Sequence, residues 1–132
     1  KMNVVTELML LKPNMVLPGQ DAQTPASIEQ VAAMTLQVLH RSVPASVAGI
    51  VFLSGGQSDE QAVAHLATMN QICAPAPWVL SFSYGRALQS DCLKLWQLDD
   101  DNVLAAQNAL SHRARANAAA TLGHCLVQEQ MS

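Results

Sequence analysis

Short, continuous apolar runs alternate along this chain with longer stretches of helical spacing. Apolar runs at residues 4–11, 49–53 and 78–83 predict three strands. The second run is apolar on both faces, which is typical of a buried parallel strand. Helices are predicted over residues 28–41, 58–70, from the turn at 84–86 to about 96, and 102–122. The pattern therefore favours an α/β chain with a parallel sheet and right-handed crossovers.

Local signals mark the ends and buried faces of these helices. Serine followed three residues later by glutamine forms a capping box before the first two helices, at Ser27–Gln30 and Ser58–Gln61. Gly123 is expected to end the last helix. Residues at helical spacing predict the apolar stripes, which are Ile28, Val31, Met34 and Val38 in the first helix and Val63, Leu66 and Met69 in the second.

Composition narrows the classes of partner. The chain has 132 residues, of which 50% are hydrophobic and 13% charged, with a formal net charge of −3. This balance argues against nucleic acid or an anionic membrane as a partner, but leaves room for a small-anion pocket. No apolar run is long enough for a transmembrane helix. The chain begins with lysine rather than methionine, which suggests a truncated, processed or partial chain.

The cysteines and histidines lack the spacing of a metal site. Three sparse cysteines fit a reducing cytoplasm, and we expect them to be small buried hydrophobes. The histidines are expected on helix surfaces, Trp78 and Trp96 are expected to pack against helices, and the aspartate run is expected to be a solvated loop that caps the last helix. These residues are Cys73, Cys92, Cys125, His40, His65, His112, His124 and Asp99–Asp101.

Lys12 is the first candidate for chemistry, because it ends an apolar strand and precedes Pro13, which favours an extended backbone. Barrel enzymes carry reactive groups at such strand ends. Desolvation in apolar surroundings lowers the pKa of a lysine and makes its amine a nucleophile toward carbonyls. The alternative is a strand-end lysine that reaches out to water.

Two strand-to-helix loops are candidates for holding an anion. Ser54-Gly55-Gly56 offers backbone amides at a helix start, and Ser83-Tyr84-Gly85-Arg86 adds a guanidinium to the same layout. The alternatives are an ordinary turn and an arginine paired with a carboxylate. Barrel enzymes often bind phosphate in the loops after strands seven and eight, which would make the Lys12 strand the sixth. Lys12 and the two loops together indicate an enzyme that forms an imine with a phosphorylated carbonyl compound.

Three segments resemble class I fructose-bisphosphate aldolases. Leu10–Val16 with Pro18-Gly19 is similar to the Schiff-base segment of that family, Phe52–Ser58 to its phosphate loop, and Ser81–Gln89 to its arginine loop. The resemblance covers roughly residues 7–124. It implies the C-terminal portion of a TIM (β/α)8 barrel, with about three βα units (strands 6–8) and a C-terminal helix. Residues 1–132 would be part of one barrel domain, incomplete as given, because a barrel needs about 250 residues.

The resemblance also implies roles and partners. Lys12 would form an imine with dihydroxyacetone phosphate or the ketose bisphosphate, with neither metal nor other cofactor. The reaction would be reversible cleavage of fructose 1,6-bisphosphate to dihydroxyacetone phosphate and glyceraldehyde 3-phosphate, in glycolysis and gluconeogenesis, by a cytoplasmic homotetramer. The residues implied to hold a substrate phosphate are Ser54, Gly55, Gly56, Ser83, Gly85 and Arg86.

The chain departs from the family in two places. Glu7-Leu8-Met9 stands where the family usually has glutamate, glycine and threonine, and the tail at 126–132 lacks the terminal tyrosine of many members. The acid–base carboxylates of the family lie on earlier strands, outside this sequence. Two other readings therefore stay open: a non-catalytic phosphate-binding fragment, and an assembly protein that pairs through open sheet edges.

Overall fold

The computed structural model describes residues 3–125. Within them, three parallel strands form one sheet in the order β1-β2-β3, and the chain alternates strand and helix as the sequence predicts. The elements are η1 (Thr6–Leu8), β1 (Leu10–Leu11), α1 (Ile28–Ser42), β2 (Gly49–Phe52), α2 (Asp59–Ile72), β3 (Val79–Phe82), α3 (Arg86–Trp96), η2 (Asp100–Asn102) and α4 (Val103–Thr121).

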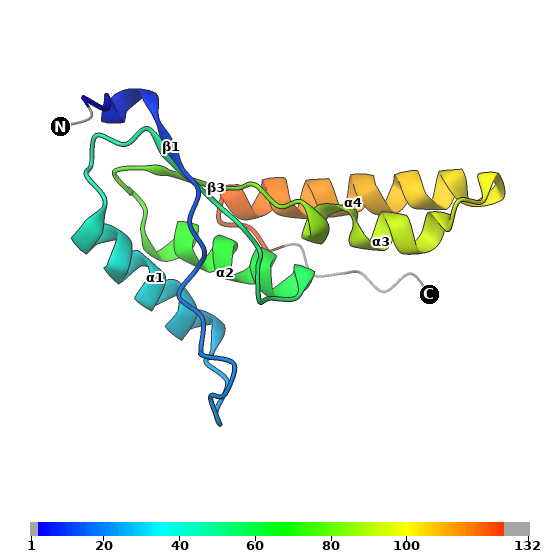
Figure 1. Ribbon diagram of the computed structural model, residues 1–132, viewed down its shortest axis with the longest axis horizontal. Helices are drawn as coiled ribbons and strands as arrows, with labels where there is room; N and C mark the ends of the chain where they lie inside the picture. Colours follow the sequence, from blue (N-terminus) through cyan, green and yellow to red (C-terminus); the bar gives the residue numbers. More distant parts are fainter. Residues whose placement is uncertain (1–2, 126–132) are drawn as a thin grey trace.

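The sheet has one packed face and one open face. Helices α1 and α2 lie along one side of the strands, while α3 and α4 pack side by side and extend beyond them (Figure 1). Ile50 and Phe52 are fully buried against these helices, and Leu80 is 2% exposed. Successive side chains in a strand point to opposite faces. Leu10 and Val79, which share a row with Gly49, point the other way and are 64% and 69% exposed.

Helices α1 and α2 begin at the predicted caps. Ser27 accepts a hydrogen bond from the backbone of Gln30, and the Gln30 side chain accepts one from the backbone of Ser27. Ser58 and Gln61 repeat the arrangement at α2, so both capping boxes are confirmed. Each box satisfies two backbone amides that the first helical turn leaves without partners.

The predicted apolar stripe of α1 is only partly right. Val31 is buried, but Met34 and Val38 are 48% and 43% exposed. The face against the core instead consists of Val31, Ala32, Thr35, Leu36 and Leu39. Helix α1 carries apolar residues on two faces, and spacing alone does not say which one meets the sheet. In α2 the predicted stripe is buried as expected.

The first strand is much shorter than predicted. Residues 4–11 were expected to be extended, but Thr6–Leu8 forms a 3-10 turn and the strand begins at Leu10. Pairing with β2 starts at Leu10 opposite Gly49, so the residues before it have no ladder to join. Instead, the Thr6 and Ser46 hydroxyls form a hydrogen bond of 2.7 Å, and Leu8 is 85% exposed. An apolar run without a partner strand therefore does not stay extended.

Several expectations for single residues are corrected. Cys73 and Cys92 are only half-buried and Cys125 is exposed, because all three lie near helix ends or outer helix faces. Among the histidines, His65 is not on the surface: it is 4% exposed, because it lies on the core side of α2. Residues 126–132, where the departure in the tail was noted, lie outside the described residues.

The expectation for Trp78 is confirmed. Its ring lies 5.0 Å from the His40 ring of α1, and its indole nitrogen donates to the Pro44 carbonyl at 2.8 Å. The expectation for the aspartate run is partly right. The Asp99 carboxylate accepts a hydrogen bond from the Asp101 backbone and so caps the turn η2, whereas Asn102 precedes α4 without a side-chain cap.

Candidate functional site at the carboxyl edge of the sheet

Backbone hydrogen bonds hold the carboxyl ends of the three strands together. The Leu53 amide donates to the Pro13 carbonyl at 3.0 Å, and the Ser83 amide donates to the Phe52 carbonyl at 2.8 Å. Each bond lies within one residue of a candidate site segment. The structure therefore brings Lys12, the loop that begins at Ser54 and the loop that begins at Ser83 to one edge of the sheet, in the order of the strands.

Lys12 lies on the side of the sheet that the helices do not cover. It follows Leu10 by two positions, and alternation along a strand therefore directs both side chains to the open face. Lys12 is exposed, so the apolar surroundings expected for a reactive lysine are not formed by residues 3–125. The backbone just beyond it is fixed, because Met15 is 3% exposed and its amide donates to the Asn14 side chain at 2.9 Å.

The loop after β2 has the glycine geometry that its sequence suggests. Gly56 has φ +79°, and a Cβ there would lie 3.3 Å from a Leu17 methyl group, so a larger residue would be strained. The Gln57 amide donates to the Ser54 carbonyl at 3.3 Å, which closes the turn. Asn14 donates to the Gly55 carbonyl at 3.3 Å and thereby ties the lysine segment to this loop.

The N-termini of α2 and α3 differ in charge. The first turn of α2 contains Asp59 and Glu60, and Ser58 caps it. Its positive dipole end is therefore already balanced. Helix α3 starts at Arg86 after Gly85, with no acidic residue in its first turn and no capping side chain. Of these two helix starts, the α3 terminus is thus the one that lacks a negative partner of its own.

Arg86 is exposed and unpaired in the described part of the chain. Among residues 3–125, no carboxylate lies within 4.0 Å of its guanidinium, whereas both Lys94 and Arg113 form ion pairs. The alternative of an arginine neutralised by a neighbouring carboxylate is therefore wrong within this range. A cation at a helix N-terminus is unfavourable, and an anion bound there would relieve the conflict.

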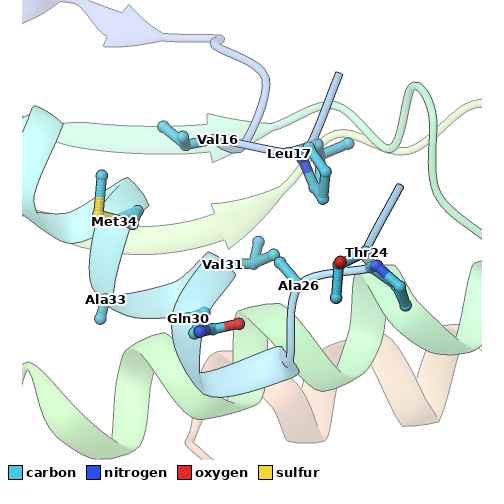
Figure 2. Close-up of a pocket in the computed structure, with 10 residues that line it drawn as sticks. Val16, Leu17, Thr24, Ala26, Gln30, Val31, Ala33 and Met34 are labelled. Atoms are coloured by element: carbon cyan, nitrogen blue, oxygen red, sulfur yellow. The ribbon is translucent and has the colours of Figure 1, made fainter. Parts of the chain in front are cut away.

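The hollows at this edge only partly coincide with the candidate residues. An apolar cavity of about 600 Å³ lies between Val16–Pro18 and the first half of α1. Figure 2 shows residues that line it, among them Val31 and Met34 of α1. It includes none of the candidate site residues. A neighbouring, more polar hollow does include Gly55 and Gly56.

Two buried polar residues, His65 beside the loops and Tyr84 within the second loop, were not predicted from the sequence to contribute to the site. His65 Nδ1 lies 2.7 Å from Gln57 Oε1, and burial lowers the pKa of His65. The Tyr84 hydroxyl donates to the Ala62 carbonyl at 3.0 Å, and burial raises the pKa of Tyr84. Tyr84 stands between the candidates Ser83 and Gly85, so its position within the loop was the signal that could have singled it out.

Within residues 3–125, no group of three or more histidine, cysteine or carboxylate side chains is arranged to hold a metal ion. The helices in the same range are all too short or too polar to cross a membrane.

Comparisons with known proteins decide the family. The family model described as glycolytic fructose-bisphosphate aldolase class-I matches residues 1–132. The chain belongs to this aldolase family. A chloroplastic aldolase of Oryza sativa is 54% identical over 121 residues, which are 92% of this chain and 31% of the relative. A Caenorhabditis elegans aldolase is 51% identical over 92% of this chain and 33% of its own length.

A solved aldolase structure has the same fold over the region it shares with this chain. The Plasmodium falciparum aldolase, solved in complex with TRAP and a small-molecule inhibitor, matches with a TM-score of 0.90 and 44% identity. The match covers 95% of this chain and 36% of that protein. The chain thus spans about a third of the length of the aldolases it matches.

Proposed function

We propose that this chain supplies the Schiff-base lysine and the substrate-phosphate loops of a fructose 1,6-bisphosphate aldolase. The observation that carries the proposal is the meeting of Lys12, the Ser54 loop and the Ser83 loop at one edge of a parallel sheet. Family membership supports the same chemistry, since the relatives are named fructose-bisphosphate aldolases. The proposed products of cleavage are dihydroxyacetone phosphate and glyceraldehyde 3-phosphate.

The phosphate would sit at the start of α3. Arg86 offers a guanidinium that no carboxylate of the described range neutralises, and the first-turn amides of α3 have no side-chain cap. Ser83 and Gly85 flank Tyr84 in the same loop, and Ser54, Gly55 and Gly56 approach from the neighbouring loop. Hydrogen bonds to an ionised phosphate are roughly twice as strong as neutral ones, which favours this combination of charge and amides.

The reaction would begin with attack of the Lys12 amine on the C2 carbonyl. The carbinolamine loses water to give a protonated imine. A base then takes the proton of the C4 hydroxyl, the C3–C4 electron pair moves into the imine, and glyceraldehyde 3-phosphate leaves. Protonation of the resulting enamine at C3 and hydrolysis release dihydroxyacetone phosphate and free Lys12. The protonated imine accepts the electron pair of the C3–C4 bond, so these steps need no metal ion for that role.

The remaining catalytic groups would come from segments outside this sequence. Residues 1–132 would form strands 6–8 and the C-terminal helix of a TIM barrel, and earlier strands would supply the acid–base carboxylates. Leu10 and Val79 point away from the helices and are largely exposed, as expected for residues that line the inside of a barrel. The complete enzyme would be a homotetramer in the cytoplasm. The location is suggested by a pea (Pisum sativum) relative that is named a cytoplasmic aldolase isozyme and is 54% identical over 92% of this chain and 33% of its own length.

The second candidate is a non-catalytic fragment that binds phosphate or assembles with other chains. The exposed Leu10 and Val79 favour association through the open face of the sheet. Such a fragment would bind phosphate or a partner chain but would form no imine. Imine formation therefore separates the two candidates.

Borohydride trapping tests the proposal. The chain is mixed with the N-terminal two thirds of the pea relative, incubated with dihydroxyacetone phosphate and reduced. We expect peptide mapping to find one secondary-amine adduct, on Lys12. Lys12→Met should abolish the adduct, whereas Lys94→Met, which removes an exposed lysine of α3, should leave it unchanged. An adduct that maps to Lys94 would contradict the assignment of the nucleophile.

A further inference from the structure

A buried arginine links the two helices that follow the candidate phosphate loops. Arg113 of α4 has a side chain only 7% exposed, and its Nη2 donates to Glu60 at 2.9 Å and to Asp91 at 2.7 Å. Glu60 is the second residue of α2, and Asp91 lies in the middle of α3. One guanidinium from the C-terminal helix therefore holds both helices.

Two further side-chain bonds join the same helices. Ser90 of α3 donates to the Asp59 carboxylate at the start of α2. Tyr84, within the second loop, donates to the Ala62 carbonyl in the first turns of α2. All three links join residues 84–91 to residues 59–62. Residues 59–62 begin α2 shortly after the loop that carries Gly55 and Gly56, and residues 84–91 include Gly85 itself and the first part of α3.

We infer that Arg113 is a positioning residue for the phosphate site: it fixes the orientation of α2 relative to α3 and so holds the two loops at the spacing that one phosphate bridges. The inference rests on the proposed function for the identity of the ligand. It assigns a role in binding to a residue of α4 that lies outside both loops.

The exposure of Glu60 and Asp91 supports a role for Arg113 in positioning the helices rather than in stabilising the fold alone. Glu60 and Asp91 are 64% and 43% exposed, so water can solvate both carboxylates when Arg113 is absent. Methionine can fill the space of the buried arginine stem with an unbranched, flexible chain. Arg113→Met should therefore leave the chain folded while removing one of the three links between α2 and α3, the one that passes through Arg113. The two carboxylates, left without their shared cation, then repel each other against the bonds that remain from Ser90 and Tyr84, and we expect the angle between α2 and α3 to change.

The test is a titration of the 132-residue chain with inorganic phosphate, followed by the NMR shifts of the Gly55, Gly56 and Gly85 amides. The dissociation constant is taken from the signals of folded molecules only, so a loss of stability does not enter it. We expect Arg113→Met to raise this constant on the order of tenfold, because small displacements of binding groups are costly. Arg113→Lys should restore part of the affinity, since its ammonium keeps the positive charge and its donors can reach a carboxylate.

The matched control is Arg115→Met, which removes an exposed arginine from the same helix. It should leave the dissociation constant for phosphate unchanged. Residual dipolar couplings of the α2 and α3 amides supply a readout that needs no phosphate: the angle between the helices should change in Arg113→Met and not in Arg115→Met. If the wild-type chain binds phosphate and Arg113→Met binds it equally well, the inference is overturned and the site stands. If phosphate shifts neither loop in the wild type, the proposed site fails, and an unchanged angle in Arg113→Met would overturn the bracing role as well.

Discussion

The two faces of the sheet differ sharply in how far this chain completes them. On the face toward the helices, Ile50, Phe52 and Leu80 are at most 2% exposed, and their neighbours form one continuous core. On the other face, Leu10 and Val79 are more than 60% exposed, and Lys12 lies open to solvent. The covered face carries the stability of the fold, whereas the open face and the adjoining edge carry the proposed chemistry.

This division explains why the candidate nucleophile is positioned but not enclosed. The backbone beside Lys12 is fixed by β2 through the bond between Leu53 and Pro13. An apolar environment for the amine requires atoms on the open face, which residues 3–125 do not supply. The position of Lys12 is thus set within residues 3–125, while an apolar environment for its amine would have to come from the rest of the proposed barrel.

The largest effect should come from truncation on the covered face. Phe52→Ala should lower the free energy of unfolding by about 3–5 kcal/mol, because it leaves a cavity in the core. Val79→Ala, on the open face of a neighbouring strand, should change it by less than about 0.5 kcal/mol. Urea unfolding followed by circular dichroism gives both values. Equal losses from the two substitutions would mean that the open face is covered in solution.

Arg86→Ala should have the next largest effect, at the site rather than in the core. It removes a charge-assisted contact to phosphate and should weaken substrate binding by about 1.5–3 kcal/mol, with little change in stability because the side chain is exposed. Arg86→Lys should recover only part of this loss. Michaelis constants of the reconstituted enzyme provide the measurement. If they stayed unchanged for phosphorylated substrates, the phosphate would have to bind elsewhere.

Polar substitution on the open face should reduce self-association. Leu10→Lys replaces an exposed leucine and should weaken association of the chain with itself by about 1 kcal/mol, since that apolar surface no longer gains from burial. Sedimentation velocity at several concentrations measures the effect. Leu8→Lys is the control, because Leu8 is also exposed but precedes the strand. An equal response to both changes would argue that general surface charge, rather than the open face, controls association.

The smallest effect should be that of acid on the free energy of unfolding, through the ion pair between Arg113 and Asp91. The hydrogen bond from Arg113 is the main cause that lowers the pKa of Asp91 below its ordinary value of 3.8. The stabilisation by this ionised carboxylate is present above about pH 4 and is lost as the pH falls through the lowered pKa. Arg113→Met should therefore show a shallower loss of stability below pH 4, by less than about 1 kcal/mol because Asp91 is 43% exposed. Parallel acid profiles for both proteins would contradict this.

Much of the fold was predictable because its signals are local. The capping boxes at Ser27 and Ser58 and the buried run Gly49–Phe52 carry their structure in their own residue types. The first strand and the α1 stripe were less predictable, because both depend on a partner distant in sequence. Thr6–Leu8 forms a 3-10 turn because no strand within residues 3–125 lies beside it to pair with. Met34 is exposed because another face of α1 packs against the core.

The residues of the candidate site also fall into those that local sequence signals predict and those that depend on partners distant in the sequence. Lys12 and the loops at Ser54 and Ser83 could be proposed as candidates from strand ends, glycines and family resemblance, and the structure brings these segments to one edge of the sheet. The buried partners of the site could not. Arg113 lies in an alanine-rich helix without any motif, and its contacts with Glu60 and Asp91 span 53 and 22 residues. Only the packing of α4 against α2 and α3 makes it a link between the loops.

The central claim is that this chain holds the lysine and phosphate loops of an aldolase site whose other groups lie elsewhere in the barrel. The most direct test is fructose 1,6-bisphosphate cleavage by a preparation whose mass confirms the 132-residue chain alone, then by the same chain mixed with the N-terminal two thirds of the pea relative. Alone, the chain should be slower than an intact aldolase by at least about 10²–10⁴, the cost of a missing proton-transfer group. The mixture should regain activity, and should lose it again with Lys12→Met. Turnover by the chain alone at the rate of an intact aldolase would contradict the claim, as would an assembled mixture that stays active with Lys12→Met.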